Sequence, residues 1–292
     1  MVETRPIEIS PLTTVGAVHL TVSDLERSLV YYRDVIGLDV LVEEEGRASL
    51  GTGGRELLEL VEEPGARPAN GYTGLFHFAL RVPERVDLAR WLAHAGRDRV
   101  RLVGLSDHFV SEAVYLSDPD DHGIEIYRDR SREVWEGQVG DRLTTQPLDV
   151  ADLLGELDGP PPDEPFDGLP AGTVMGHVHL RVATIPETVD FYRDVLGFDL
   201  MAQLGPQAAF LSAGGYHHHV GANTWESFGA PAPPPGTAAL RRATVVLPDS
   251  EERDRVLERL EDAEYAVEEV GDDPLVRDPS GNALVLTLES AG

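Results

Sequence analysis

Two histidines and one glutamate occupy positions in the sequence where side chains could hold a metal ion. His77 lies near the start of LFHFALRVPE, His177 lies near the start of GHVHLRV, and Glu125 lies between two isoleucines in GIEIY. A carboxylate in that apolar setting needs a partner, because burying an unpaired charge is costly; the alternative is an edge-strand glutamate that faces water. Two histidines with one carboxylate suit non-haem Fe(II) and leave coordination positions free for a substrate and O₂.

Three adjacent histidines lie in GGYHHHVGANTW (214–225), which we predict to be the last strand of a structural module. Successive side chains of a strand point to opposite faces, so the three cannot all face one way. We expect His218 to point opposite to its neighbours and into any cavity. The alternative is a histidine cluster on the surface.

His108 and Tyr115 precede the Glu125 segment, in SDHFVSEAVYLSDPD (106–120). Near a metal, a histidine donor and a tyrosine hydroxyl could position a bound phenolate or stabilise charge that develops on oxygen. Without the other residues they would be an ordinary loop histidine and strand tyrosine.

A long-period duplication separates site histidines from scaffold histidines. Residues 16–41 (GAVHLTVSDLERSLVYYRDVIGLDVL) resemble residues 176–201 (GHVHLRVATIPETVDFYRDVLGFDLM) as an alternating strand followed by a helix. His19 and His179 occupy the same position in both copies, which favours a role in packing or hydrogen bonding. His177 has Ala17 as its counterpart, which favours a site.

Each copy contains two modules that we predict to be βαβββ units. Aligning LRV (80–82) with LRV (180–182) places His77 at the address of His177. A Pro- and Gly-rich stretch at 159–172 is typical of a linker between the copies, and a second one at 229–236 is expected to connect the last two modules. The predicted modules cover residues 14–62, 73–130, 173–222 and 237–289.

The composition restricts the classes of function. The chain has no cysteine, so any metal must be held by His, Asp or Glu. Acidic residues number 52 against 24 basic ones, all arginine, and the net charge of -28 makes nucleic acid an unfavourable partner. An acidic, lysine-free surface suits a very salty cytoplasm, where screening removes self-repulsion, and indicates a halophile.

No apolar run is long enough for a membrane span and no secretory leader is evident, so we expect a cytoplasmic protein without a membrane partner.

The combination of GHVHL, GGYHHHVGANTW and DHFVSEAVYLSDPDDHGIEIYRD resembles the vicinal-oxygen-chelate superfamily of glyoxalases, bleomycin-resistance proteins and extradiol dioxygenases. Within it, the chain looks most like the two-domain bacterial catechol 2,3-dioxygenases, over nearly its whole length. The resemblance implies an α+β fold of four βαβββ modules in two vicinal-oxygen-chelate domains. We place the first domain at 14–132, a helical and Pro-rich linker at 133–172 and the second domain at 173–292.

The resemblance also implies roles for individual residues. His177, His77 and Glu125 match the positions of the iron ligands, and the acid–base histidine is carried to His218, with His217 and His219 as rivals. His108 and Tyr115 match the second active-site histidine and the tyrosine of the family.

One departure from the family pattern affects the pairing of modules. The familiar ring-cleaving dioxygenases gather their ligands in the C-terminal domain, but here module four offers Arg242 and Val285 at the ligand positions. The site must therefore join module two with module three and leave modules one and four as a metal-free pair. A site made of Glu59, His77 and Glu125 within the first domain is the competing assignment.

The resemblance implies that the chain cleaves catechol or a substituted catechol next to the diol, with O₂ and Fe(II), or Mn(II) as the other metal. Its partners would then be a small aromatic diol and O₂, and a homo-oligomer is expected because dimers and tetramers are common in the family. The rivals are a glyoxalase-like metal-dependent lyase or isomerase, which two carboxylates and no need for O₂ would favour, and a non-catalytic protein that binds a small aromatic.

Overall fold

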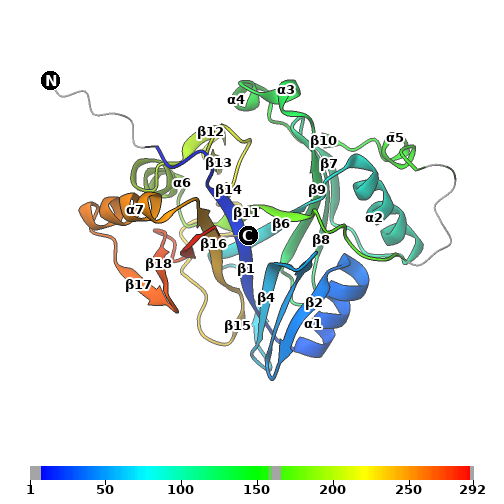
Figure 1. Cartoon of the computed structure of the whole chain (residues 1–292), viewed down its shortest axis with the longest axis horizontal. Helices are drawn as coiled ribbons and strands as arrows, with labels where there is room; N and C mark the ends of the chain where they lie inside the picture. The colour runs from blue at the N-terminus through cyan, green and yellow to red at the C-terminus, as the bar shows by residue number, and fades with distance from the viewer. Residues whose placement is uncertain (1–7, 158, 160–165, 290–292) are drawn as a thin grey trace.

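The computed structural model describes residues 8–157, 159 and 166–289, and it contains two large mixed sheets (Figure 1). Each sheet combines strands from both copies of the sequence repeat. Modules two and three form the nine-stranded sheet, and modules one and four form the eight-stranded sheet. The module pairing that the departure from the family pattern predicted is therefore present, as is the α+β fold of repeated modules.

The nine-stranded sheet holds the predicted site residues. Its strand order is β10-β7-β8-β9-β6-β11-β14-β13-β12. In that order the bounds are Gln146–Pro147, Gly104–Asp107, Ser111–Ser117, Gly123–Asp129, Gly74–Arg81, Val174–Arg181, Val220–Asn223, Ala208–Ser212 and Asp199–Leu204. Its helices are α2 (Arg85–Arg97) and α6 (Ile185–Val189), which continues in a π-helical turn over Asp190–Val195.

The eight-stranded sheet has the order β17-β18-β19-β16-β1-β4-β3-β2. In that order the bounds are Val267–Val270, Asp273–Arg277, Ala283–Leu288, Leu240–Leu247, Thr14–Val22, Arg55–Glu62, Arg47–Thr52 and Asp39–Glu44. Its helices are α7 (Ser250–Asp262) and α1 (Leu25–Tyr31), which continues in a π-helical turn over Tyr32–Ile36. A small sheet pairs β5 (Arg67–Pro68) with β15 (Thr237–Ala238).

The predicted linker contains three short helices among its described residues: α3 (Arg132–Trp135), α4 (Val139–Arg142) and α5 (Val150–Leu154). Helix α5 contacts α2, and α4 contacts β12 of the nine-stranded sheet (Figure 1). Residues 158 and 160–165 of the predicted linker lie outside the described part of the chain. The domain limits at residues 132 and 172 stay a prediction.

The central strand β11 shows how the sequence positions the site. Val178 and Leu180 are buried in the apolar core. Because strand side chains alternate, His177, His179 and Arg181 point to the opposite face, where they line a cavity. The strand is buried on both faces, so the polar residues of the second face lie in a largely water-excluded environment.

The acidic composition leads to a prediction about stability. Raising KCl from about 0.1 M to about 1 M shortens the Debye length from about 10 Å to about 3 Å and screens the repulsion within a chain of net charge -28. We expect the thermal midpoint to rise by roughly 2–8 °C, as a gain of about 1–2 kcal/mol would produce. A melting series followed by circular dichroism, with sucrose as the uncharged control, measures this. A midpoint that falls or stays constant with KCl would contradict the halophilic interpretation.

Candidate metal centre

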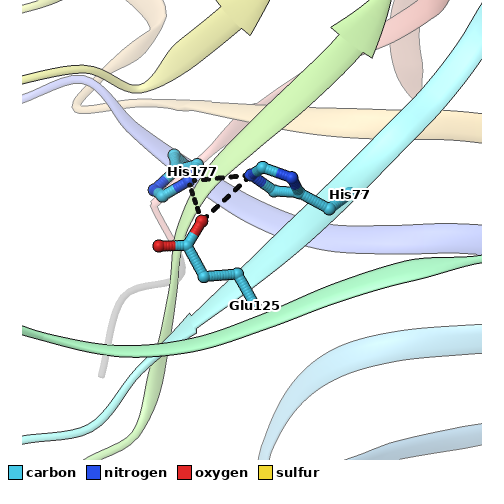
Figure 2. A group of neighbouring side chains, drawn as sticks. All are labelled: His77, Glu125 and His177. Atoms are coloured by element: carbon cyan, nitrogen blue, oxygen red, sulfur yellow. Dashed lines mark hydrogen bonds and ion pairs between the residues drawn. The ribbon is translucent and has the colours of Figure 1, made fainter. Parts of the chain in front are cut away.

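His77, Glu125 and His177 converge from three neighbouring strands of the nine-stranded sheet (Figure 2). The Nε2 atoms of His77 and His177 each lie 3.0 Å from Oε2 of Glu125, and 3.4 Å from each other. All three side chains are buried, and Glu125 is only 2% exposed. The structure thus brings together the three residues that the sequence analysis proposed as metal ligands.

Strand register accounts for this convergence. In the antiparallel pair β6–β11 His177 lies opposite Ala79, and in the parallel pair β6–β9 Ala79 lies opposite Glu125. His177 and Glu125 therefore flank the small side chain of Ala79 in one row across three strands. His77 is two residues from Ala79 on the same strand, so it projects from the same face.

Burial and mutual contact set the charge states of these groups. Burial would raise the pKa of the Glu125 carboxyl, but the two imidazoles beside it hold that pKa well below its ordinary value. Burial lowers the pKa of His177 to about 4, against the opposing effect of Glu125. An ionised carboxylate and a neutral imidazole, as at Glu125 and His177, are the donor states that a metal requires.

The donor set fits a divalent metal ion. Metal–donor distances of about 2.0–2.2 Å for imidazole nitrogen and carboxylate oxygen mean that donor atoms sharing one ion lie within about 4.4 Å of one another. The observed separations of 3.0, 3.0 and 3.4 Å are within that limit. Two histidines and one carboxylate with open positions are typical of non-haem Fe(II) oxygenases.

His218 lines the cavity beside this group, and its ring centroid lies 4.0 Å from that of His177. Behind it, Nε2 of His217 lies 2.7 Å from Oδ1 of Asp129, and the Nδ1 atoms of His217 and His218 lie 2.9 Å apart. Because the carboxylate accepts, Nε2 of His217 donates to it, and in a neutral His217 the Nδ1 atom then accepts from Nδ1–H of His218. This arrangement leaves Nε2 of neutral His218 without a proton.

Electrostatics support a neutral His218. Burial, followed by the charges of His177 and His217, places the pKa of His218 well below its ordinary value. Burial would raise the pKa of Asp129, but the hydrogen bond and charge of His217, with Arg81, lower it. The tyrosines of this region join the same network: Tyr216 donates to Asp129 at 2.9 Å and shares a 2.8 Å hydrogen bond with Tyr127.

The histidine run differs from the strand that the sequence predicted. His217, His218 and His219 precede β14 and lie in an irregular segment, so strand alternation does not decide their directions. His219 is held by the backbone, since its Nδ1 accepts from the N–H of Ala213 at 3.1 Å. The expectation that His218 faces the cavity agrees with the structure, but the reason is the pair of anchors on its neighbours.

His108 and Tyr115 also line the cavity, and they contact each other. Nδ1 of His108 donates to the carbonyl oxygen of Thr144 at 2.7 Å, so its Nε2 accepts from the Tyr115 hydroxyl at 2.8 Å. Tyr115 lies opposite Glu125 in the β8–β9 pair. Burial and then the Glu125 charge raise the pKa of Tyr115 well above its ordinary value, so the phenol keeps its proton.

The competing ligand Glu59 lies in the other sheet. It pairs with His19 in the register of β1 and β4, and its Oε2 lies 3.1 Å from Nδ1 of His19 and 3.2 Å from Arg47. The structure therefore does not bring Glu59 to His77 and Glu125. His19, Glu56 and Glu59 do form a second His/Glu group, but Arg47 already neutralises its central carboxylate.

His179 was predicted to have a packing or hydrogen-bonding role, but it lines the cavity. Nδ1 of His19 lies 3.1 Å from Oε2 of Glu59, whereas His179 faces the cavity and its Nε2 has no hydrogen-bond partner among the described residues. In the register of β11 and β14 the position of Glu59 is taken by Gly221, where any Cβ would lie 2.8 Å from the His179 ring. Alternation from His177 along one strand was the signal that could have identified it.

The cavity has a volume of about 680 Å³, and it has both polar and apolar walls. That volume is within the range of roughly 300–1,000 Å³ found for pockets that hold drug-sized ligands. Among its apolar lining residues are Phe76, Val110, Leu143, Phe210 and Trp225. A single aromatic ring bound at the His77–Glu125–His177 group would therefore leave much of the cavity free.

Comparisons with known proteins identify the family of the chain. The family described as the Glyoxalase/Bleomycin resistance protein/Dioxygenase superfamily matches residues 14–126 and 174–286. The chain is 42% identical over 279 residues to the catechol-2,3-dioxygenase of Bacillus subtilis (strain 168), covering 94% of this chain and 96% of that protein. The chain belongs to this superfamily. Its similarity to that enzyme over nearly the whole of both chains makes it a dioxygenase-like oxidoreductase.

Solved structures show the same fold. The crystal structure of a candidate dioxygenase from Bacillus subtilis aligns with a TM-score of 0.65 at 15% identity, covering 99% of this chain and 87% of that one. Glyoxalase I from Zea mays aligns with a TM-score of 0.55 at 16% identity, covering 94% and 92%. At these identities the matches support the fold alone.

Among the described residues, no helix is long and apolar enough to cross a membrane.

Proposed function

We propose that this protein is an extradiol ring-cleaving dioxygenase that acts on catechol or a substituted catechol with O₂ at a non-haem Fe(II) centre. The observation that carries the proposal is the convergence of His77, His177 and Glu125 in a buried cavity. The similarity to a protein named catechol-2,3-dioxygenase supports the same reaction. Bound Fe(II) would supply chelation of the two hydroxyls and the redox chemistry of O₂.

The protein's own residues supply proton transfer and orientation. His218, with Nε2 unprotonated and its Nδ1–H fixed by His217, is suited to take a proton from a catechol hydroxyl and return it later. The single hydroxyl proton of Tyr115 is donated to His108 in this structure, so Tyr115 would stabilise negative charge on a bound oxygen by turning that proton away from His108. The apolar wall excludes water from the ring.

The rival functions have less support. A glyoxalase-like lyase would be favoured by two carboxylates, but the buried His/Glu group of the described residues contains one, Glu125. A binding protein for a small aromatic needs no metal, so a formed set of three donor atoms would have no purpose there.

The test is anaerobic loading with Fe(II) in high salt, followed by catechol and then air. We expect a yellow ring-opened product and O₂ uptake in parallel. A Zn(II)-loaded sample is the matched control, because zinc has no redox chemistry, and Mn(II) loading tests the alternative metal. Absence of product from folded, iron-loaded protein would reject the proposal.

A further inference from the structure

Arg181 is a buried cation in the wall of the cavity. It follows His177 and His179 on the same face of β11, and all three line the cavity. The side chain belongs to a residue that is only 8% exposed. A buried cation is normally held by an anion, because removing a charge from water is costly.

Among the described residues, Arg181 has no such partner. Its Nη1 donates to the carbonyl oxygen of Ala69 at 3.0 Å, and its buried Nε has no hydrogen-bond partner in the described part of the chain. No carboxylate among the described residues forms an ion pair with it. Asp121 and Glu226 also line the cavity, but both are exposed and act only at longer range. Burial lowers the pKa of the guanidinium despite these acids, so the charged form is incompletely compensated.

Arg81 provides a comparison within the chain, since the LRV alignment gives it the same module address. Arg81 forms an ion pair with Asp129 at 3.2 Å and lies over the ring of Tyr216. Those partners raise the pKa of its guanidinium. The two arginines occupy equivalent positions in their modules. Among the described residues, Arg81 has a carboxylate partner, whereas Arg181, which lines the cavity, has none.

The sequence repeat shows that strand formation does not require this cation. Thr21 occupies the position of Arg181 in the first copy, just as Ala17 occupies that of His177. Strand β1 of the eight-stranded sheet therefore lacks counterparts of His177 and Arg181, although it keeps the shared histidine, His19. This pattern associates Arg181 with the cavity and not with the scaffold.

We propose that Arg181 binds an anionic substituent, a carboxylate, on the aromatic diol that enters this cavity. The inference rests on the proposed function and specifies its substrate class. The Cα atoms of His177 and Arg181 are four residue steps apart along the strand, or about 13 Å, which a ring at the metal group and a short acidic side chain could span. A carboxylate would complete the hydrogen bonds of the guanidinium, whose fork of donors matches it.

The test measures binding without turnover, in Fe(II)-loaded protein under anaerobic conditions. The matched ligands are 3,4-dihydroxyphenylacetate and its neutral amide, titrated by calorimetry. We expect the acid to bind about 10- to 100-fold more tightly than the amide to the wild-type protein, as a charged hydrogen-bonded contact would give. In Arg181→Thr, the residue of the first copy, the preference should fall to about one while amide affinity is retained.

Two further variants make the result specific. Arg101→Thr removes an exposed arginine and should keep the preference for the acid, which controls for the change in overall charge. Arg181→Lys should keep part of the preference, because it retains the charge without the planar fork, and it substitutes for Arg181→Thr if that variant does not fold.

The outcomes separate this inference from the proposed function. An equal affinity for acid and amide in the wild type, or a preference that survives in Arg181→Thr, would overturn the role of Arg181 even if both diols are cleaved in air. An Arg181-dependent preference without ring cleavage would support the anion site and reject the dioxygenase proposal.

Discussion

Replacing Glu125 with glutamine should reduce Fe(II) affinity more than about 100-fold and abolish ring cleavage at ordinary iron concentrations. Loss of an outer-shell partner typically costs 10- to 100-fold in metal affinity, so loss of the one carboxylate among the three donors should cost more. Glutamine keeps the size of the side chain but removes the negative charge that both imidazoles face at 3.0 Å. Iron content after desalting and a competition titration against a chelator measure the effect.

Glu59→Gln is the matched control for this substitution. Glu59 also lies beside a histidine on a neighbouring strand, but in the eight-stranded sheet and with Arg47 at 3.2 Å. We expect it to leave iron content and catechol turnover near the wild-type values. Equal loss of iron in both variants would show that the metal is not held by the His77–Glu125–His177 group. Iron retained in Glu125→Gln would contradict the proposed ligand role directly.

The sequence predicted the positions of the three candidate ligands within their modules. It did not predict that their side chains lie close together. The repeat identified His177 by contrast with Ala17, and the LRV alignment identified His77. Their distance depends on which modules share a sheet, and this was inferred only because Arg242 and Val285 stand at the ligand positions of module four. The register that brings His177 and Glu125 to either side of Ala79 is a long-range property of three strands.

Equal positions in the two copies of the repeat can have different neighbours in the structure. His19 and His179 share an address, and the shared address favoured a scaffold role for both. Their surroundings differ at one cross-strand position, which is Glu59 beside His19 and Gly221 beside His179. A residue about forty positions away in the sequence therefore decides whether the histidine lies beside a carboxylate or faces a cavity.

The histidine run shows a different limit. Alternation predicted one direction for His218, but the segment is not a strand. What fixes these side chains is the contact of His217 with Asp129 at 2.7 Å and of His219 with the backbone of Ala213. Asp129 lies 88 positions from His217 in the sequence, and no local pattern connects the two.

Replacing His218 with asparagine should leave Fe(II) binding unchanged and lower kcat by about 10²- to 10⁴-fold, the usual contribution of a positioned general acid–base group. Asparagine is smaller than histidine and fits the same wall of the cavity, but it cannot take a proton near neutral pH. His218 does not belong to the His77–Glu125–His177 group, so all three proposed metal ligands should remain in place. Iron content and steady-state O₂ uptake, measured on the same preparation, separate the two properties.

His219→Gln is the matched control from the same run of histidines. Glutamine offers an oxygen that can replace Nδ1 of His219 as the acceptor for the N–H of Ala213, so the segment should keep its conformation. We expect kcat near the wild-type value in this variant. A His218→Asn protein that loses iron would place His218 among the ligands, and one that keeps full turnover would show that another residue transfers the proton.

The remaining groups of this wall are less suited to proton transfer. His217 is hydrogen-bonded to Asp129, and the pKa of the Tyr115 phenol is raised so far that it keeps its proton.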